Sequence, residues 1–135
     1  LQHEGSIVSK ILDGYGFDVT HVSCKTGAFN KEDLGIPKAY KLRPESTFEA
    51  ACNPVTQAEV CNRENTELNI IVGLCLGHDI LFTRYSKAPS TVFIVKDRVT
   101  GNNPVAALYS SYHRMTLFKK KSLEEFVQSL YAPRK

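Results

Sequence analysis

Two continuous apolar segments constrain the fold of this 135-residue chain more than any other feature of its sequence. Residues 68–74 read LNIIVGL and residues 91–95 read TVFIV. Strands that are buried on both faces have such uninterrupted apolar runs, whereas a half-exposed strand alternates polar and apolar side chains. The two segments therefore predict parallel strands in the interior of an α/β sheet.

Helical segments flank these strands along the chain. The spacing of Ile7, Val8, Ile11 and Leu12 predicts a helix that Gly16 ends. Further helices are expected at about residues 53–62, 79–86 and 105–112, and residues 17–23 (FDVTHVS) predict another strand. Alternating helices and strands predict a three-layer, Rossmann-like α/β sandwich with a mainly parallel sheet.

The domain organisation follows from the same pattern. A strand normally precedes the first helix of an α/β unit, so we expect a strand N-terminal to Leu1 that this sequence lacks. Residues 1–114 form the predicted α/β domain. Residues 115–135 are predicted to be a basic linker, with a lysine run at residues 119–121, and a C-terminal helix that begins with the capping box Ser122 and Glu125.

Composition narrows the function classes. A net charge of +3, spread along the chain, does not favour nucleic acid as a partner. No apolar stretch approaches the roughly 20 residues that cross a bilayer, and the first residues lack a signal-peptide pattern. We therefore expect a soluble cytoplasmic protein without a membrane partner, whose four cysteines serve as thiols, metal ligands or nucleophiles.

The positions of three cysteines predict a common site. Cys24 follows the first expected strand and Cys75 ends the second, while Cys52 directly precedes a helix start. Parallel sheets bind ligands beyond the carboxyl ends of their strands, where helix N-termini also lie. Because thiolates and imidazole bind zinc and thiolates bind iron–sulfur clusters, Cys24, Cys52, Cys75 and His78 are predicted metal ligands. The alternative is that these cysteines are small packed residues, as we expect for Cys61.

Polar residues at the same predicted edge are candidates for binding a cofactor. Asp97 and Arg98 follow the third expected strand. Asn53 and Asn103 each precede a proline, an arrangement typical of a capped helix start. These four residues are expected to lie around the cysteines.

A second interpretation concerns residues 73–77, which read GLCLG. This pattern matches the strand-to-helix turn that presents the nucleophile of many hydrolases, with cysteine in place of serine. Cys75 would then be the nucleophile and His78 the base of a hydrolase or thiol-redox enzyme, with Asp79 as an orienting acid. A tight turn permitted by Gly73 and Gly77 is the structural alternative.

Four stretches carry a family resemblance: VSCKTG (22–27), FEAACNPVTQAEVCN (48–62), ELNIIVGLCLGHDILFTRYSKAPSTVFIVKDR (67–98) and TGNNPVAALY (100–109). Together they resemble an uncharacterised family of prokaryotic metal-binding proteins, DUF1847. The resemblance implies metal binding, together with a Cys-rich N-terminal segment and a central strand that are absent from this sequence. It leaves a third possibility, a non-catalytic subunit that is completed by another chain or by a second copy of itself.

Overall fold

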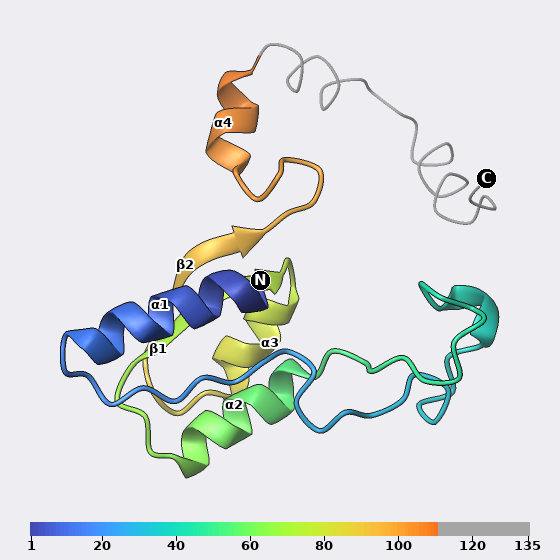
Figure 1. Cartoon of the computed structure of the whole chain (residues 1–135), viewed down its shortest axis with the longest axis horizontal. Coiled ribbons are helices and arrows are strands. Elements are labelled where there is room, and N and C mark those ends of the chain that lie inside the picture. The colour runs from blue at the N-terminus through green and yellow to red at the C-terminus, as the bar shows by residue number, and fades with distance from the viewer. Residues whose placement is uncertain (111–135) are drawn as a thin grey trace. The chain divides into compact units, whose positions relative to one another are not determined.

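The computed structural model describes residues 1–110, which fall into two units that divide between Asp97 and Arg98. The first unit contains, in chain order, α1 (Gln2–Gly14), η1 (Lys38–Tyr40), α2 (Pro54–Arg63), β1 (Asn69–Cys75), α3 (His78–Tyr85) and β2 (Ser90–Lys96) (Figure 1). In the second unit, the described residues form α4 (Pro104–Tyr109). The predicted C-terminal helix and the predicted domain boundary at residue 115 lie outside the described residues.

The sheet of the first unit consists of β1 and β2, which pair in parallel. Their residues pair from Asn69 with Ser90 to Cys75 with Lys96, and the register shifts on both sides of Val72. Gly73 lies at this irregularity with φ +70°, a value that other residues rarely adopt. The two apolar segments are thus parallel strands, as their sequences predicted. The prediction that both are buried is wrong for β2, where Val92 and Phe93 are 44% and 65% exposed.

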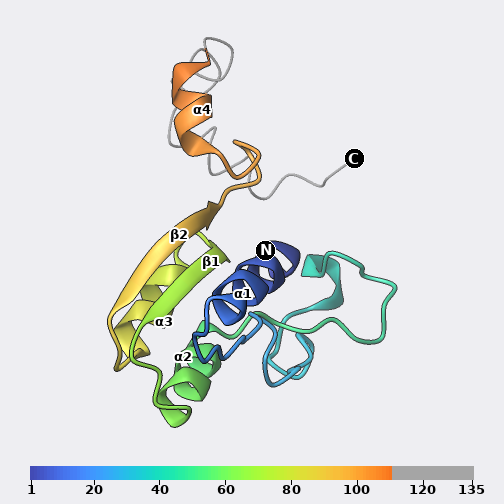
Figure 2. The same cartoon turned by 60° about the vertical axis from the view of Figure 1, so that its left-hand side comes forward.

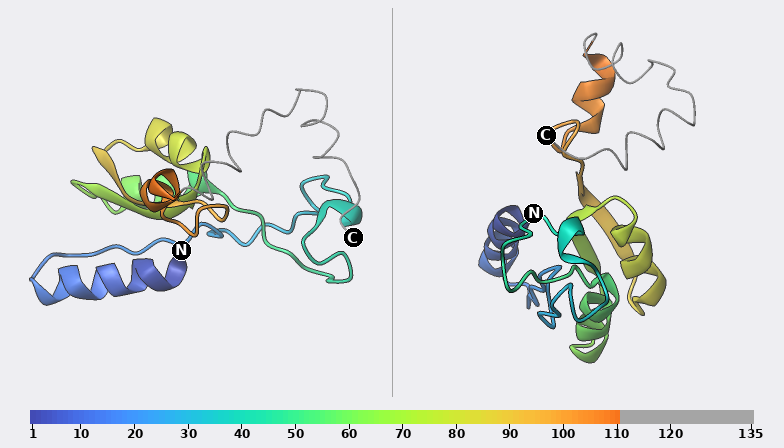
Figure 3. Two further views of the ribbon diagram at one scale, coloured as in Figure 1. Left: turned by 90° about the horizontal axis from the view of Figure 1, so that it is seen from above. Right: turned by 90° about the vertical axis from the view of Figure 1, so that its right-hand side faces the viewer.

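Helices lie on both sides of β1. In Figures 2 and 3, α1 lies on one side of β1 and α3 on the other, while α2 packs against α3. The side chain of Asn53 accepts a hydrogen bond from Thr56 N at 3.0 Å and thereby caps α2. Asn103 caps α4 in the same way through Ala106 N, so both predicted asparagine–proline helix starts are confirmed.

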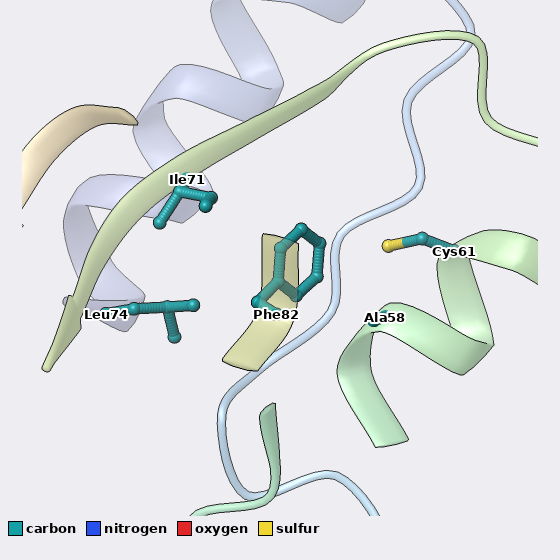
Figure 4. Close-up of a cluster of buried hydrophobic side chains, with 5 residues drawn as sticks. All are labelled: Ala58, Cys61, Ile71, Leu74 and Phe82. Atoms are coloured by element: carbon teal, nitrogen blue, oxygen red, sulfur yellow. The ribbon is translucent and has the colours of Figure 1, made fainter. Parts of the chain in front are cut away.

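The hydrophobic core of the first unit is small. It consists of Ala58 and Cys61 from α2, Ile71 and Leu74 from β1, and Phe82 from α3 (Figure 4). Cys61 is 7% exposed among these side chains, which agrees with its predicted packing role. The core therefore joins the sheet to α2 and α3, with Val22 and Cys24 packed against it.

The predicted strand at residues 17–23 is wrong. This segment has no regular secondary structure, although its composition favours a strand. A strand exists only where another backbone pairs with it, and none of the described residues does so here. The described fold is consequently a mixed α/β unit with a two-stranded parallel sheet.

Residues 28–51 make a long excursion between this segment and α2 (Figure 1). Its two legs run antiparallel, with backbone hydrogen bonds from Lys31 N to Glu49 O and from Ala51 N to Phe29 O. The buried ammonium of Lys41 donates to Glu32 and to the carbonyl of Ser46. Paired backbone and a neutralised buried charge thus give the excursion a defined structure.

No helix within residues 1–110 has the length and apolar character to cross a bilayer.

Candidate functional site

Two of the predicted site cysteines are neighbours. The thiol of Cys52 donates a hydrogen bond to Cys24 Sγ, with the two sulfur atoms 4.0 Å apart although the residues are 28 positions apart in sequence. Cys52 is exposed and Cys24 is half-buried, and all four cysteines are free thiols. The pair therefore lies at the surface, where a ligand has access to it.

Backbone contacts hold the two cysteines together. The carbonyl of Cys24 accepts a 2.7 Å hydrogen bond from Asn53 N, which joins the end of the extended segment to the start of α2. Asn53 uses its side chain to cap α2, so Cys52 directly precedes a fixed helix N-terminus. The thiol pair thus rests on the backbone of two elements, and the side chain predicted to bind a cofactor at Asn53 serves as a cap.

The third cysteine, Cys75, is the last residue of β1 and is half-buried. Partial desolvation of the Cys52 thiol raises its pKa above the ordinary value of 9.0, and the negative charges of thiolates at Cys24 and Cys75 raise it further. The positive charge of Lys25 acts in the opposite direction. Cys75, at the carboxyl end of β1, is therefore one of the residues whose charge influences the Cys52 thiol.

His78 is the first residue of α3. Its Nδ1 is buried and has no hydrogen-bond partner in the described structure. One carboxylate oxygen of Asp79 accepts hydrogen bonds from Gly77 N and Ile80 N, so this oxygen caps the turn into α3. The residues proposed as base and orienting acid are therefore not joined through His78 Nδ1 here.

The turn after Cys75 has part of the geometry of a nucleophile turn. β1 ends at Cys75, Gly77 has φ +95°, and α3 begins at the next residue. Cys75 itself is not among the described residues with positive φ, whereas the nucleophile of that motif lies on a strained turn. The strand, turn and helix are present, but the strain at the cysteine is not.

Within residues 1–110, no group of three or more His, Cys, Asp or Glu side chains is arranged to hold a metal ion. The thiol pair is the part of the predicted ligand set that the structure brings into contact. Asp97 ends the first unit, whereas Arg98 and Asn103 belong to the second. Their predicted role around the cysteines stays a prediction.

Sequence reasoning missed two residues that matter for this region. Lys25 follows Cys24 directly and lowers the pKa of Cys52, a role that its position next to a site cysteine could have suggested. Gln57 is buried at 5% exposure and donates from Nε2 to Val22 O, but its Oε1 has no partner among the described residues. A buried glutamine whose amide oxygen has no hydrogen-bond partner cannot be recognised from the sequence.

Fold and site together define a class: a mixed α/β unit with two neighbouring thiols near the carboxyl end of a parallel strand. The family model described as "Protein of unknown function (DUF1847)" matches residues 1–93, and the chain belongs to this family.

An uncharacterized protein of the archaeon Methanocaldococcus jannaschii, MJ0455, is 47% identical to the chain over 121 residues. The match covers 90% of this chain and 60% of the relative, so the chain spans less than two thirds of that protein's length. No solved structure matches the chain. The predicted family is thus confirmed, and its description assigns neither a metal nor a reaction.

Proposed function

We propose that this protein binds a thiophilic metal ion or an iron–sulfur cluster, with Cys24 and Cys52 as paired thiolate ligands. The observation that carries the proposal is the 4.0 Å separation of the two sulfur atoms. Two thiolates that bind one zinc ion at about 2.3 Å each, at the tetrahedral angle, lie about 3.8 Å apart. The pair therefore needs little movement to accept such an ion.

Two further side chains are proposed to complete the site. Cys75 is the proposed third thiolate, because its charge acts on Cys52. The orphaned Nδ1 of His78 makes its imidazole a candidate for the fourth position or for a contact beside the ligands. A bound metal would hold these segments together, and an iron–sulfur cluster would add one-electron transfer.

Metal binding at this site should release protons. Thiols bind metals as thiolates, and the raised pKa keeps Cys52 protonated at neutral pH in the absence of metal. Binding must therefore release protons and weaken as the pH falls. A reducing compartment, which we propose to be the cytoplasm, would keep the pair from oxidising.

The test is a titration of the reduced chain with cobalt(II), a spectroscopic substitute for zinc. We expect a sulfur-to-cobalt charge-transfer band at one equivalent, and its loss in Cys24→Ala and Cys52→Ala. Cys61→Ala is the matched control, because Cys61 is packed in the core and should leave the band unchanged. A band that survives both site substitutions, or no band in the parent chain, would refute the proposal.

A second candidate is a cysteine-dependent hydrolase or thiol-redox enzyme with Cys75 as nucleophile and His78 as base. The observation that favours it is the half-buried Cys75 at the end of β1, directly before the turn into α3. Selective alkylation of Cys75 by iodoacetamide below pH 7 would support this reading. Equal slow labelling of Cys75 and Cys61 would exclude an activated thiol.

We further propose that the complete protein is the three-layer, Rossmann-like sandwich predicted from sequence. The parallel pairing of β1 with β2 and the helices on both sides of β1 support it. A crystal structure of the complete protein would test this fold by its number of parallel strands.

A further inference from the structure

The thiol pair has a second chemistry besides metal binding. The sulfur atoms of Cys24 and Cys52 are 4.0 Å apart in the reduced chain. Bonded sulfur atoms in a disulfide are about 2.05 Å apart, so a movement of about 2 Å would join them. Cys52 is exposed and Cys24 is half-buried, which gives a small oxidant access to the pair.

The backbone on either side of the pair permits this bond. The carbonyl of Cys24 accepts a 2.7 Å hydrogen bond from Asn53 N, the residue after Cys52. With standard backbone dimensions, this contact places the Cα atoms of the two cysteines at most about 7.5 Å apart. Cysteines joined by a disulfide usually have Cα atoms roughly 4.4–6.8 Å apart. Rotation of the two side chains, with little movement of the backbone, is therefore sufficient.

The other two cysteines are placed differently. Cys61 is packed in the hydrophobic core at 7% exposure, where an oxidant has little access to it. Cys75 influences Cys52 through its charge, but the hydrogen bond between thiols joins Cys52 to Cys24. The geometry therefore selects one pair among the four cysteines.

We infer that Cys24 and Cys52 are a redox modification site, at which hydrogen peroxide forms a reversible disulfide within one chain. One thiolate attacks a peroxide oxygen, so that an S–O bond forms, the O–O bond breaks and hydroxide leaves as water after taking up a proton. The other thiolate attacks the resulting sulfenic acid, the S–S bond forms, and the S–O bond breaks with release of a second water. The two thiols thereby give two electrons and two protons to the peroxide.

The disulfide has a consequence for metal binding, and this consequence alone rests on the proposed function. Metals bind to thiolates, and a disulfide offers none. Oxidation of the pair should therefore release a metal ion held by Cys24 and Cys52. A small oxidant would in this way control the occupancy of the site.

The test treats the reduced, metal-free chain with one equivalent of hydrogen peroxide. The pKa of Cys52 is raised, so the reaction is run at about pH 8.5, where more of the thiolate is present. We expect the intact mass to fall by two hydrogen atoms and dithiothreitol to restore it. Addition of oxygen without loss of hydrogen, or a bond between two chains, would overturn the inference.

Peptide mapping identifies the bonded cysteines. Cys52 and Cys61 occur in the same tryptic peptide, so the mapping uses the Cys61→Ala variant, which should form the bond in the same yield as the parent chain. We expect the peptide of Cys24 to be linked to that of Cys52. A link to Cys75 in its place would overturn the inference.

A substitution at the exposed position makes the result specific. Cys52→Ala should lower the yield of product that has lost two hydrogen atoms at least tenfold and should leave Cys24 to gain oxygen. Circular dichroism of the variant shows that it is folded. An undiminished yield of this product in Cys52→Ala would contradict the assigned pair.

Cobalt(II) titration of the oxidised chain separates this inference from the proposed function. We expect the charge-transfer band to be absent after oxidation and to return after reduction and removal of the reductant. If the disulfide forms but the reduced chain gives no band, the proposed function fails and the modification site stands. A band of full strength in the oxidised chain would overturn the control of metal binding by oxidation.

Discussion

At the scale of single residues, the thiol pair shows how sequence neighbours differ from spatial ones. Cys24 and Cys52 meet because Asn53 N bonds to the carbonyl of Cys24, which brings two distant backbone segments together. Lys25, adjacent to Cys24 in sequence, acts on Cys52 through its charge. The pKa of Cys52 therefore depends on residues that are distant from it in sequence: Cys24, Lys25 and Cys75.

The pKa of Cys52 provides a prediction at this scale. Cys24→Ala removes a neighbouring charge and a hydrogen bond that both raise this pKa, so the pKa should fall toward 9.0. Lys25→Met removes a lowering influence and should raise it. The pH dependence of Cys52 alkylation, followed by mass spectrometry, measures both shifts. Shifts of the same sign in the two variants would contradict the assigned causes.

Gly73 provides a second prediction. Its φ of +70° and the close approach of the Leu1 side chain leave no room for a methyl group. Gly73→Ala should therefore destabilise the chain by about 1–3 kcal/mol. Gly14→Ala is the control, because a Cβ at Gly14, the last residue of α1, meets open space and should leave the stability nearly unchanged. Chemical denaturation of both variants gives the comparison, and an unaffected Gly73→Ala would show that the close contact is not required.

At the scale of elements, the excursion of residues 28–51 depends on ion pairs rather than on a core. Glu49 bonds to Lys31 and also accepts from the backbone N–H groups of Leu42 and Arg43. One carboxylate thus joins both legs of the excursion to the turn region between them. Buried apolar area is small here, because Leu34, Tyr40 and Leu42 are all exposed.

This arrangement makes the excursion sensitive to acid. The hydrogen bond from Lys31 lowers the pKa of Glu49 from its ordinary 4.5 to about 2, with help from the backbone donors. Because the pKa is lower in the folded state, the stabilisation is complete above about pH 4.5 and is lost as the pH falls toward 2. Hydrogen exchange of the Leu42 and Arg43 amides should accelerate over this interval beyond its intrinsic pH dependence.

A matched pair of variants isolates the cause. Lys31→Met should move the Glu49 pKa upward, toward 4.5, which NMR titration of the carboxylate measures. Lys38→Met removes the exposed partner of Glu32 and should leave the pKa of Glu49 unchanged. Equal shifts in both variants would assign the effect to overall charge rather than to the direct hydrogen bond.

At the scale of the whole molecule, ligand binding and stability are linked. A metal bound at Cys24 and Cys52 stabilises the folded state, which holds the thiols together, more than the unfolded chain. At a zinc concentration one hundred times the Kd, the gain is about 2.7 kcal/mol. Thermal unfolding of the reduced chain with and without zinc measures it. Cys61→Ala should retain the gain and Cys52→Ala should lose it.

The sequence predicted those parts of the fold that depend on neighbouring residues. The β1 and β2 segments are recognisable from their apolar runs, and the caps at Asn53 and Asn103 from the chemistry of one side chain. Residues 17–23 have equally favourable composition, but a strand needs a second backbone, which composition does not report. The contact between Lys31 and Glu49, 18 positions apart, is likewise invisible to local patterns.

The same limit applies to the candidate site. Parallel strands direct their carboxyl ends to one edge of a sheet, and from this rule Cys24, Cys52 and Cys75 were predicted to share a site. The rule does not give distances, so the close pairing of Cys24 with Cys52 had to come from the structure. The burial of Gln57 Oε1 also depends on packing by several elements and has no sequence counterpart.

Cys24 and Cys52 lie at the two ends of the excursion, and this position has a topological consequence. Any bridge between the sulfur atoms, through a metal or as a disulfide, would turn the intervening residues into a closed ring. A protease that cuts once inside this ring would leave the two fragments attached, whereas the unbridged chain would separate on denaturation. Closing the ring also removes freedom from the unfolded chain, by an amount that grows with the logarithm of its length.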